Sequence, residues 1–189
     1  MSPPLPARTP LISIDDYIDG ELQTEIKHEY LAGEIVAMGG ASARHGLIAG
    51  ALFAALLSHA RRKGCQLFMA DMKVRVEQMG ETYFYYPDLL LSCDAEDRET
   101  YYRRNPCLIV EVLSPSTERI DRREKLFAYR SIPGLREYVL IDPDQRKVEV
   151  YRHACGGTHE VITEGSVRLD CIDAAIALDD IYMDAEREM

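Results

Sequence analysis

The sequence contains no run of about 18 apolar residues, the length that a helix needs to cross a bilayer, so we expect no membrane partner. A secretory signal is also missing: residues 1–12 are rich in proline and lack an apolar core, and we expect a disordered lead there. CxxC spacing is absent, and the cysteines are odd in number: Cys65, Cys93, Cys107, Cys155 and Cys171. This pattern argues against a disulfide framework and a zinc knuckle, and it indicates a reducing, cytoplasmic location.

Basic residues are scarce relative to acidic ones, with 22 Lys and Arg against 32 Asp and Glu and a formal net charge of −10. This balance is typical of proteins without a polyanionic partner, since phosphate contacts need Lys and Arg. Two features weaken that exclusion. Part of the negative charge falls near the C-terminus, where we expect an acidic solvated tail at 183–189, and positive charge is concentrated between Arg119 and Arg136.

The length and composition favour one domain. The chain has 189 residues, of which 47% are hydrophobic, enough to fill a single core. We therefore predict one domain over residues 13–182.

Capping signals mark the predicted helices. Ser13 opens a capping-box pattern that predicts a short helix to about residue 19. Apolar residues recur at helical spacing from 43 to 62, and Gly64 follows as a C-cap. Acids at 121 and 124 predict a helix over 121–131, with Asp121 as its cap.

Apolar runs and turn residues mark the strands. Gly33 separates two short segments and predicts a hairpin over 29–38. Further strands are predicted at 72–77, 83–92, 107–113, 136–141 and 147–152. The order of elements predicts an α+β (mixed α/β) domain, in which a mixed β-sheet is flanked by helices.

Two carboxylates occur where acids are costly. Asp88 interrupts the apolar strand 83–92, and Glu111 lies inside the apolar run 107–113. An ionised carboxylate is expensive to bury unless it is paired or bound to a metal. A single acid in such a position can equally well be a structural carboxylate whose hydrogen bonds are satisfied. Two of them on neighbouring predicted strands favour a shared divalent-metal site, and hard oxygen ligands suit magnesium or manganese.

Lys125 lies on the predicted helix after the Glu111 strand, with Asp121 one turn earlier and Tyr129 one turn later. Near a metal and a phosphate, a lysine can orient a water, stabilise developing negative charge, or act as a base if its pKa falls. Lysines on exposed helix faces are common, so a plain surface charge is the alternative interpretation.

Two other features have both a functional and a structural interpretation. His45, near the start of the helix over 43–62, can contact the site or a phosphate, or serve as a local capping or packing group. The cluster of Tyr83, Tyr85 and Tyr86 can stack on bases, or pack half-buried against the sheet.

These residues lie in stretches that resemble the Uma-type (Uma-two) family of restriction endonucleases, within the PD-(D/E)XK nuclease superfamily. The resemblance is carried by YPDLLL at 86–91, LIVEVLSPST at 108–117 and PGLREYVLIDP at 133–143. The spacing of Asp121, Lys125 and Tyr129 also fits, as does EYLAGEIVAM at 29–38. The resemblance spans roughly residues 13–182 and implies a restriction endonuclease-like core.

The same resemblance implies roles for individual residues. The superfamily's Pro-Asp falls on residues 87–88 and its following acid on Glu111, so that Asp88 and Glu111 are implied metal ligands. The backbone carbonyl of Val112 is implied as a third ligand. Glu29 is implied as a further catalytic acid from the N-terminal region.

The catalytic lysine departs from the superfamily pattern. Its usual place, two residues after the acid, falls on Leu113, which cannot serve. The Uma-type pattern supplies a lysine from the next helix instead, and here that residue is Lys125.

The resemblance implies a magnesium- or manganese-dependent endonuclease that hydrolyses phosphodiester bonds in nucleic acid, DNA in preference to RNA. We expect a homodimer, because cutting both strands of a duplex is simplest with two symmetric sites. A catalytically silent nuclease fold that serves as a binding or assembly module is the alternative, and the net charge favours it. A nuclease that gains its DNA affinity from a partner is a third interpretation.

Overall fold

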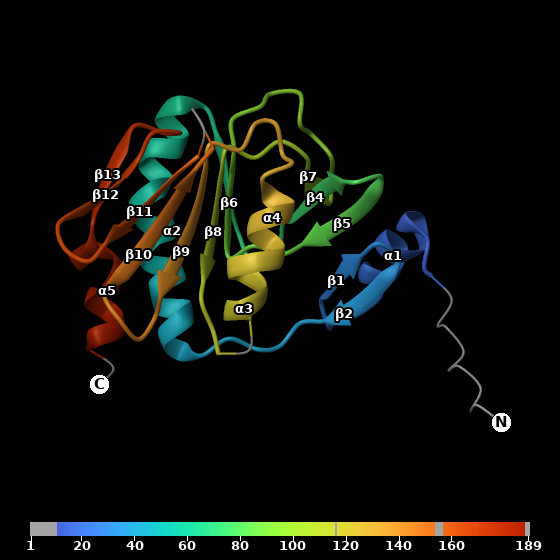
Figure 1. Ribbon diagram of the computed structural model, residues 1–189, viewed down its shortest axis with the longest axis horizontal. Helices are drawn as coiled ribbons and strands as arrows, with labels where there is room; N and C mark the ends of the chain where they lie inside the picture. Colours follow the sequence, from blue (N-terminus) through green and yellow to red (C-terminus); the bar gives the residue numbers. More distant parts are fainter. Residues whose placement is uncertain (1–10, 116, 154–156, 188–189) are drawn as a thin grey trace.

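A six-stranded mixed sheet forms the centre of the computed structural model, which describes residues 11–115, 117–153 and 157–187 (Figure 1). Its order is β11-β10-β9-β8-β6-β3. The strands are β3 (Gln66–Met69), β6 (Leu89–Ser92), β8 (Leu108–Val112), β9 (Glu137–Asp142), β10 (Lys147–Arg152) and β11 (Thr158–Ile162). β8 and β9 are parallel, and the other neighbours are antiparallel. The predicted mixed sheet is confirmed; residues 1–10 of the predicted lead lie outside the described residues.

A second sheet of five strands packs beside the first, in the order β2-β1-β5-β4-β7. Its strands are β1 (His28–Leu31), β2 (Glu34–Ala37), β4 (Lys73–Gln78), β5 (Glu81–Tyr85) and β7 (Tyr102–Arg103). The predicted hairpin is confirmed: β1 turns into β2 through Ala32 and Gly33, whose φ angles are 52° and 99°. A turn with positive φ at both central positions matches the twist of a two-residue hairpin.

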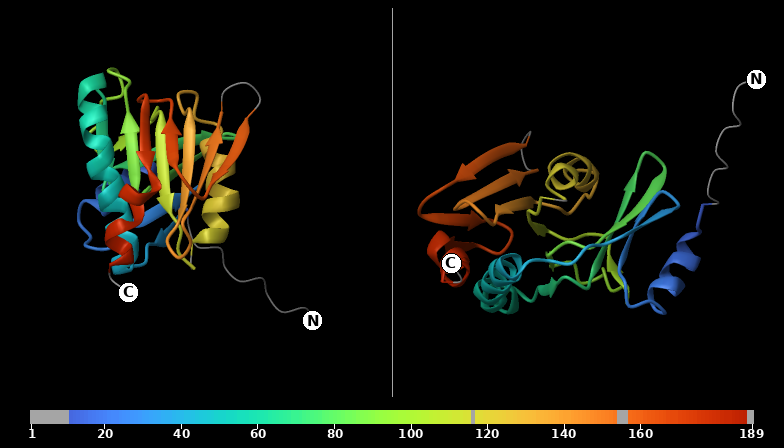
Figure 2. Two further views of the ribbon diagram at one scale, coloured as in Figure 1. Left: turned by 90° about the vertical axis from the view of Figure 1, so that its left-hand side faces the viewer. Right: turned by 90° about the horizontal axis from the view of Figure 1, so that it is seen from below.

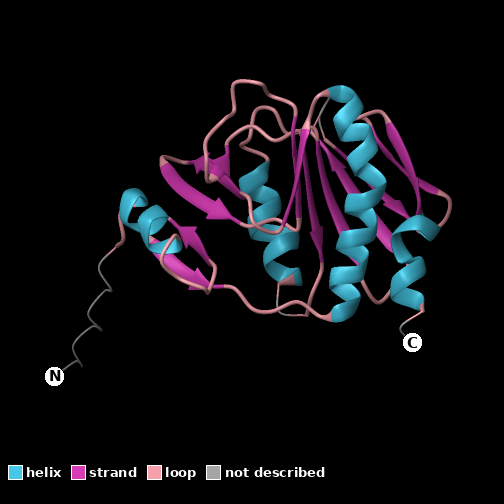
Figure 3. Ribbon diagram, turned by 180° about the vertical axis from the view of Figure 1, so that it is seen from behind, coloured by secondary structure: helices cyan, strands magenta, loops and turns pink. Residues whose placement is uncertain are grey.

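Helices cover both faces of the central sheet (Figures 2 and 3). α2 (Ala43–Lys63) and α5 (Leu178–Glu186) lie on one face, beside the hairpin of β12 (Ser166–Leu169) and β13 (Ala174–Ala177). The opposite face is covered by a helical segment made of α3 (Glu118–Ile120), the π-helical turn η1 (Asp121–Lys125) and α4 (Leu126–Tyr129). α1 (Ile14–Glu21) packs on the five-stranded sheet through Tyr17. No helix in the described ranges is long and apolar enough to cross a membrane.

The single strand predicted over 83–92 is wrong. β5 ends at Tyr85, β6 begins at Leu89, and the two strands belong to different sheets. Pro87 lies between them, and a proline has no N–H with which to continue a strand ladder. The break leaves Asp88 immediately before the first residue of β6.

Two further expectations are corrected. Asp121 is not a helix cap, because the helical segment already begins at Glu118 and the Asp121 side chain is buried. The acidic residues near the C-terminus are not a solvated tail up to Glu186. They lie on α5, whose other face buries Ile181 and Ala185, so helical packing holds this segment against α2.

The prediction that the cysteines form no disulfides is also wrong. Cys65 is bonded to Cys93, and Cys107 to Cys171, whereas Cys155 lies outside the described residues. The bonded partners are 28 and 64 residues apart, so only the sheet topology brings them together. The odd count and the lack of CxxC spacing therefore carry no information about compartment, and the cytoplasmic location stays a prediction.

Candidate active site

Asp88 and Glu111 lie at the same end of the β6–β8 pair. Leu89 pairs with Val110 in the antiparallel register, Asp88 directly precedes Leu89, and Glu111 directly follows Val110. Both residues line one cavity, which makes them candidates to share one ion. β8 is buried along its whole length, so Glu111 is presented from a rigid central strand.

Two donors hold the Asp88 carboxylate. His45 Nε2 lies 2.8 Å from Oδ1, and the backbone N–H of Val112 donates to Oδ2 over 2.7 Å. His45 stands in the first turn of α2, where the hydroxyl of Ser42 accepts a hydrogen bond from its backbone N–H. The contact with the site that we considered for His45 is thus present. The Asp88 hydrogen bond raises the pKa of His45 above its ordinary value, and burial opposes this shift.

Lys125 lies at the centre of a cluster of carboxylates. Its Nζ is 3.0 Å from Glu111 Oε1, 3.1 Å from Glu29 Oε1 and 3.2 Å from Asp121 Oδ1. The side chain is 4% exposed, so the plain-surface-charge interpretation is wrong. The π-helical turn contains both Asp121 and Lys125, and both side chains are buried there. Such turns are frequent at functional sites, because the widened backbone changes where side chains point.

The charge on Lys125 follows from these contacts. Burial by itself would lower the pKa of Lys125, but the attraction of Glu111, Glu29 and Asp121 raises it well above its ordinary value. Lys125 is therefore a charged ammonium at neutral pH. Of the three roles that the sequence allows, this favours orienting a water or stabilising negative charge over acting as a base.

Glu111 experiences opposite influences. Burial raises the pKa of its carboxyl well above the ordinary value of 4.5, Lys125 opposes the rise, and the charges of Asp121 and Asp88 add to it. Lys125 and the hydroxyl of Tyr129 both donate to its Oε1, the latter over 3.1 Å. Neutralising an ionised Glu111 thus requires more positive charge than Lys125 supplies.

All of these groups line one cavity of about 340 Å³. It receives side chains from β1, α2, β8 and the helical segment, and its polar lining includes Glu29, His45, Asp88, Glu111, Asp121 and Lys125. The five predicted site residues are therefore brought together: Asp88, Glu111, Val112, Lys125 and Glu29. Asp121 is not a helix cap, but its expected pairing with Lys125, four residues later, is present.

The cavity fits a divalent cation. Four carboxylates face one lysine and one histidine, so negative charge exceeds positive charge. The buried Glu29 Oε1 and Asp121 Oδ1 atoms both form ion pairs with Lys125. Lys125 also pairs with Glu111, so a further cation in the cavity would offset negative charge that one ammonium does not balance. Across the described ranges, no three carboxylate or imidazole groups of this cavity converge within 4.8 Å of one another. A magnesium ion, which needs only one or two protein carboxylates besides water and phosphate, suits this arrangement.

The tyrosine cluster packs rather than presenting a binding face. Tyr85 and Tyr86 are buried, and the Tyr86 hydroxyl donates to Glu21 over 2.7 Å. Tyr83 and Tyr85 stack with their ring centroids 6.2 Å apart. The structural interpretation therefore holds for Tyr85 and Tyr86, although Tyr86 also lines the cavity.

Comparison with known proteins places the chain among similar sequences and folds. Residues 14–173 match the Uma2 family, described as "Putative restriction endonuclease". Two uncharacterized proteins of Synechocystis sp. are each 34% identical to the chain: slr1290, aligned over 92% of both chains, and sll1609, aligned over 84% of this chain and 89% of the relative. A crystal structure from Anabaena variabilis, described as a "putative nuclease belonging to DUF820", has the same fold. Its TM-score is 0.71 at 20% identity, over 92% of this chain and 99% of that one.

Proposed function

The chain belongs to the Uma2 family, described as "Putative restriction endonuclease", and on this basis we propose that it hydrolyses phosphodiester bonds in nucleic acid with the help of Mg²⁺ or Mn²⁺. One observation carries the proposal: Asp88 and Glu111 line one cavity that also contains the buried ammonium of Lys125. Carboxylates can hold a metal ion that activates water, and a lysine can stabilise negative charge that develops on a phosphate.

The metal would be held by Asp88, Glu111 and the backbone carbonyl of Val112. When bound, such an ion polarises a phosphate oxygen and lowers the pKa of a bound water. Val112 supports this assignment through its other backbone group, because its N–H already fixes the orientation of the Asp88 carboxylate. His45 is proposed as a positioning residue that fixes the other oxygen of Asp88.

Lys125 would stabilise negative charge on the phosphate and orient the attacking water. Glu29 and Asp121 would hold the ammonium at the wall of the cavity, since both lie within 3.2 Å of it. In this arrangement Glu29 positions Lys125. The alternative is that Glu29 holds a second metal ion or its water shell.

DNA as the substrate and a homodimer as the active form are further proposals. A single chain of net charge −10 offers little electrostatic attraction to a polyanion. A second copy or a partner protein would enlarge the footprint, and two symmetric sites would cut both strands of a duplex. The competing function is a silent nuclease fold that only binds or assembles, which the same net charge favours.

Cleavage of supercoiled plasmid tests the proposed function. The native chain with Mg²⁺ or Mn²⁺ is expected to cut the plasmid, chelation should stop cleavage, and Asp88→Ala should lower the rate by at least about 100-fold. Asp180→Ala, an exposed aspartate on α5, is the control and should retain the native rate. Linear product without accumulated nicked circles would support paired sites. Equal rates for the native chain and Asp88→Ala would contradict the catalytic assignment. No cleavage of plasmid, single-stranded DNA or RNA by the native chain would favour the silent module.

A further inference from the structure

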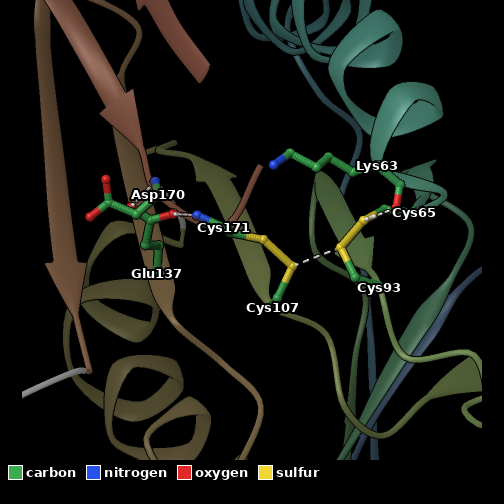
Figure 4. The surroundings of a disulfide bond; sticks show 7 residues. All are labelled: Lys63, Cys65, Cys93, Cys107, Glu137, Asp170 and Cys171. Atoms are coloured by element: carbon green, nitrogen blue, oxygen red, sulfur yellow. Dashed lines mark hydrogen bonds between the residues drawn. A yellow bond between two sulfur atoms is a disulfide. The ribbon is translucent and has the colours of Figure 1, made fainter. Parts of the chain in front are cut away.

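Four cysteines lie together at the end of the core that is opposite the candidate active site. Cys65 follows the C-terminus of α2, Cys93 follows β6, and Cys107 precedes β8. Cys171 comes from the turn between β12 and β13. We call these four residues the cysteine cluster (Figure 4).

Three elements, α2, β6 and β8, each have a residue of the candidate active site at one end and a cysteine of the cluster at the other. α2 begins near His45, β6 begins after Asp88, and β8 ends just after Glu111, while each has a cysteine of the cluster at its other end. Glu111 is four positions after Cys107 along the chain, a distance of roughly 13 Å at about 3.3 Å per residue in a strand. The cysteine cluster is therefore too far from the cavity to share an ion with it.

The sulfur atoms are close across the two disulfides as well as within them. Cys93 Sγ lies 3.5 Å from Cys107 Sγ, and the sulfurs of Cys93, Cys107 and Cys171 all lie within 4.8 Å of one another. Cys65 joins this group through its bond to Cys93. In a tetrahedral zinc site with Zn–S bonds of about 2.3 Å, neighbouring sulfurs are about 3.8 Å apart. The spacing between the two pairs already approaches that value.

We propose that, when its disulfides are reduced, the cysteine cluster binds one Zn²⁺ through four thiolates. Reduction of the two disulfides takes four electrons and four protons, which two equivalents of a dithiol reductant supply as they are oxidised to disulfides. Zinc binding then replaces the four thiol protons, which are released to solvent. The chain would thereby alternate between a disulfide-linked and a zinc-linked form of the same cluster.

The backbone around the cluster is fixed independently of the sulfur bonds. The N–H of Cys107 donates to Leu91 O over 2.8 Å, and the N–H of Cys65 donates to Ala60 O over 2.9 Å. These contacts belong to the sheet and to the end of α2, so they remain when the disulfides are reduced. Preformed ligand positions lower the entropy cost of binding an ion.

Glu137 holds the turn that carries Cys171, the fourth cysteine of the cluster. Its carboxylate is 1% exposed and accepts hydrogen bonds from the N–H groups of Asp170, over 3.0 Å, and Cys171, over 3.1 Å (Figure 4). Glu137 stands in β9, next to β8, so it ties the turn that carries Cys171 to the strand beside Cys107. Groups that orient metal ligands from outside the coordination shell are a regular part of zinc sites.

Cobalt binding to the fully reduced, metal-free chain tests this site. One Co²⁺ per chain is expected to bind to the cysteine cluster and to produce the near-ultraviolet thiolate-to-cobalt charge-transfer absorption, which cobalt bound to carboxylates does not produce. Zn²⁺ should displace this cobalt because zinc binds such ligands more tightly. Cys93→Ser is the first variant, because Cys93 is exposed and serine should be tolerated there. It should weaken binding by more than about 100-fold, beyond the 10–100-fold typical of groups outside the coordination shell.

Two controls separate this site from the candidate active site and from general thiol binding. Cys155→Ser should give the same thiolate-to-cobalt absorption, at the same affinity, as the native chain. Asp88→Ala should also leave this absorption unchanged, because it removes only a ligand of the carboxylate site. Cys65→Ser should repeat the loss seen with Cys93→Ser, and circular dichroism of each variant shows whether the fold is retained. Absence of the charge-transfer absorption in the reduced native chain, or its persistence at native affinity in both folded variants, would overturn the proposal whatever the outcome of the cleavage assay.

Discussion

Replacing Lys125 with methionine is expected to lower the free energy of unfolding by about 3–5 kcal/mol at neutral pH, the cost of leaving buried charges without a partner. Methionine is unbranched and one heavy atom shorter than lysine, and the substitution removes the ammonium together with its charge and its hydrogen-bond donors. The ammonium stands within 3.2 Å of three carboxylates, those of Glu29, Glu111 and Asp121. Thermal unfolding should shift downward by roughly 10 °C or more for a chain of this size.

The pH dependence of this effect has a definite sign. Because the native-state pKa of Lys125 is raised, its stabilisation is complete below the ordinary pKa of 10.5 and is lost only as pH rises through the higher native value. The full difference between native and variant is therefore present at pH 7. It should shrink as pH falls, because the pKa of Glu111 is raised above 4.5 and its carboxyl, once protonated, no longer needs a counter-charge.

Lys147→Met is the matched control. Lys147 also forms ion pairs, at 3.2 Å from Asp142 and 3.7 Å from Glu149, but its side chain is 26% exposed. A solvated pair of this kind contributes about 1 kcal/mol or less. Denaturant titration of both variants checks the prediction. If Lys125→Met were no more destabilising than Lys147→Met, the buried charge cluster would not have the energetic role described here.

Replacing Glu111 with glutamine is expected to have opposite effects on activity and stability. Cleavage should fall by about 1000-fold or more, since loss of a metal ligand removes several kcal/mol of transition-state stabilisation. Stability in the presence of a chelator should rise at pH 7, because burial penalises the ionised carboxylate of Glu111 and glutamine carries no charge. Glutamine keeps an oxygen that can accept from Lys125 or Tyr129.

The stability gain should appear only above the pKa that Glu111 has in the unfolded chain. A raised native-state pKa means that the ionised carboxylate is penalised in the fold. The penalty is absent below the ordinary pKa of 4.5 and grows as pH rises toward the native value. Denaturant titrations at pH 4 and pH 7 therefore distinguish this cause from a general packing effect. Lower stability of Glu111→Gln than of the native chain at pH 7 would contradict it.

Elements with local signals could be predicted from the sequence. Ser13 caps α1 through its side chain, and Gly64 closes α2 with a φ of 69°. Gly33 marks the β1–β2 turn, and a Cβ there would meet Leu11 at 2.9 Å. The apolar run 107–113 became β8, buried on both faces. In each case the information lies within a few residues of the element.

Features set by long-range packing could not be predicted in the same way. The stretch 83–92 looks continuous in hydrophobicity, yet its halves serve different sheets, and only Pro87 hinted at the break. β12, β13 and α5 carry weak local patterns and are defined by their packing against α2. The pairing of Cys107 with Cys171 depends on where the β12–β13 turn meets the core, which no spacing rule encodes.

The candidate site also combines residues that the sequence indicates with contacts that only the fold determines. Asp88 and Glu111 stood out because acids in apolar strands need an explanation, and the structure places both in the lining of one cavity. The contact of His45 with Asp88 and that of Glu29 with Lys125 join residues 43 and 96 positions apart, so they follow from the fold alone. The burial of Asp121 follows from the π-helical turn, which the sequence pattern does not distinguish from an ordinary helix.

Calorimetric titration of the 189-residue chain with Mn²⁺ tests the central claim that Asp88 and Glu111 form a divalent-metal site. Keeping the chain in its disulfide form removes the cysteine cluster as a competing ligand. The native chain should bind Mn²⁺ in the cavity, Asp88→Ala should abolish that binding, and His45→Ala should weaken it by about 10–100-fold. Asp180→Ala should bind like the native chain. Equal Mn²⁺ binding by the native chain and Asp88→Ala, or no binding by either, would contradict the metal site.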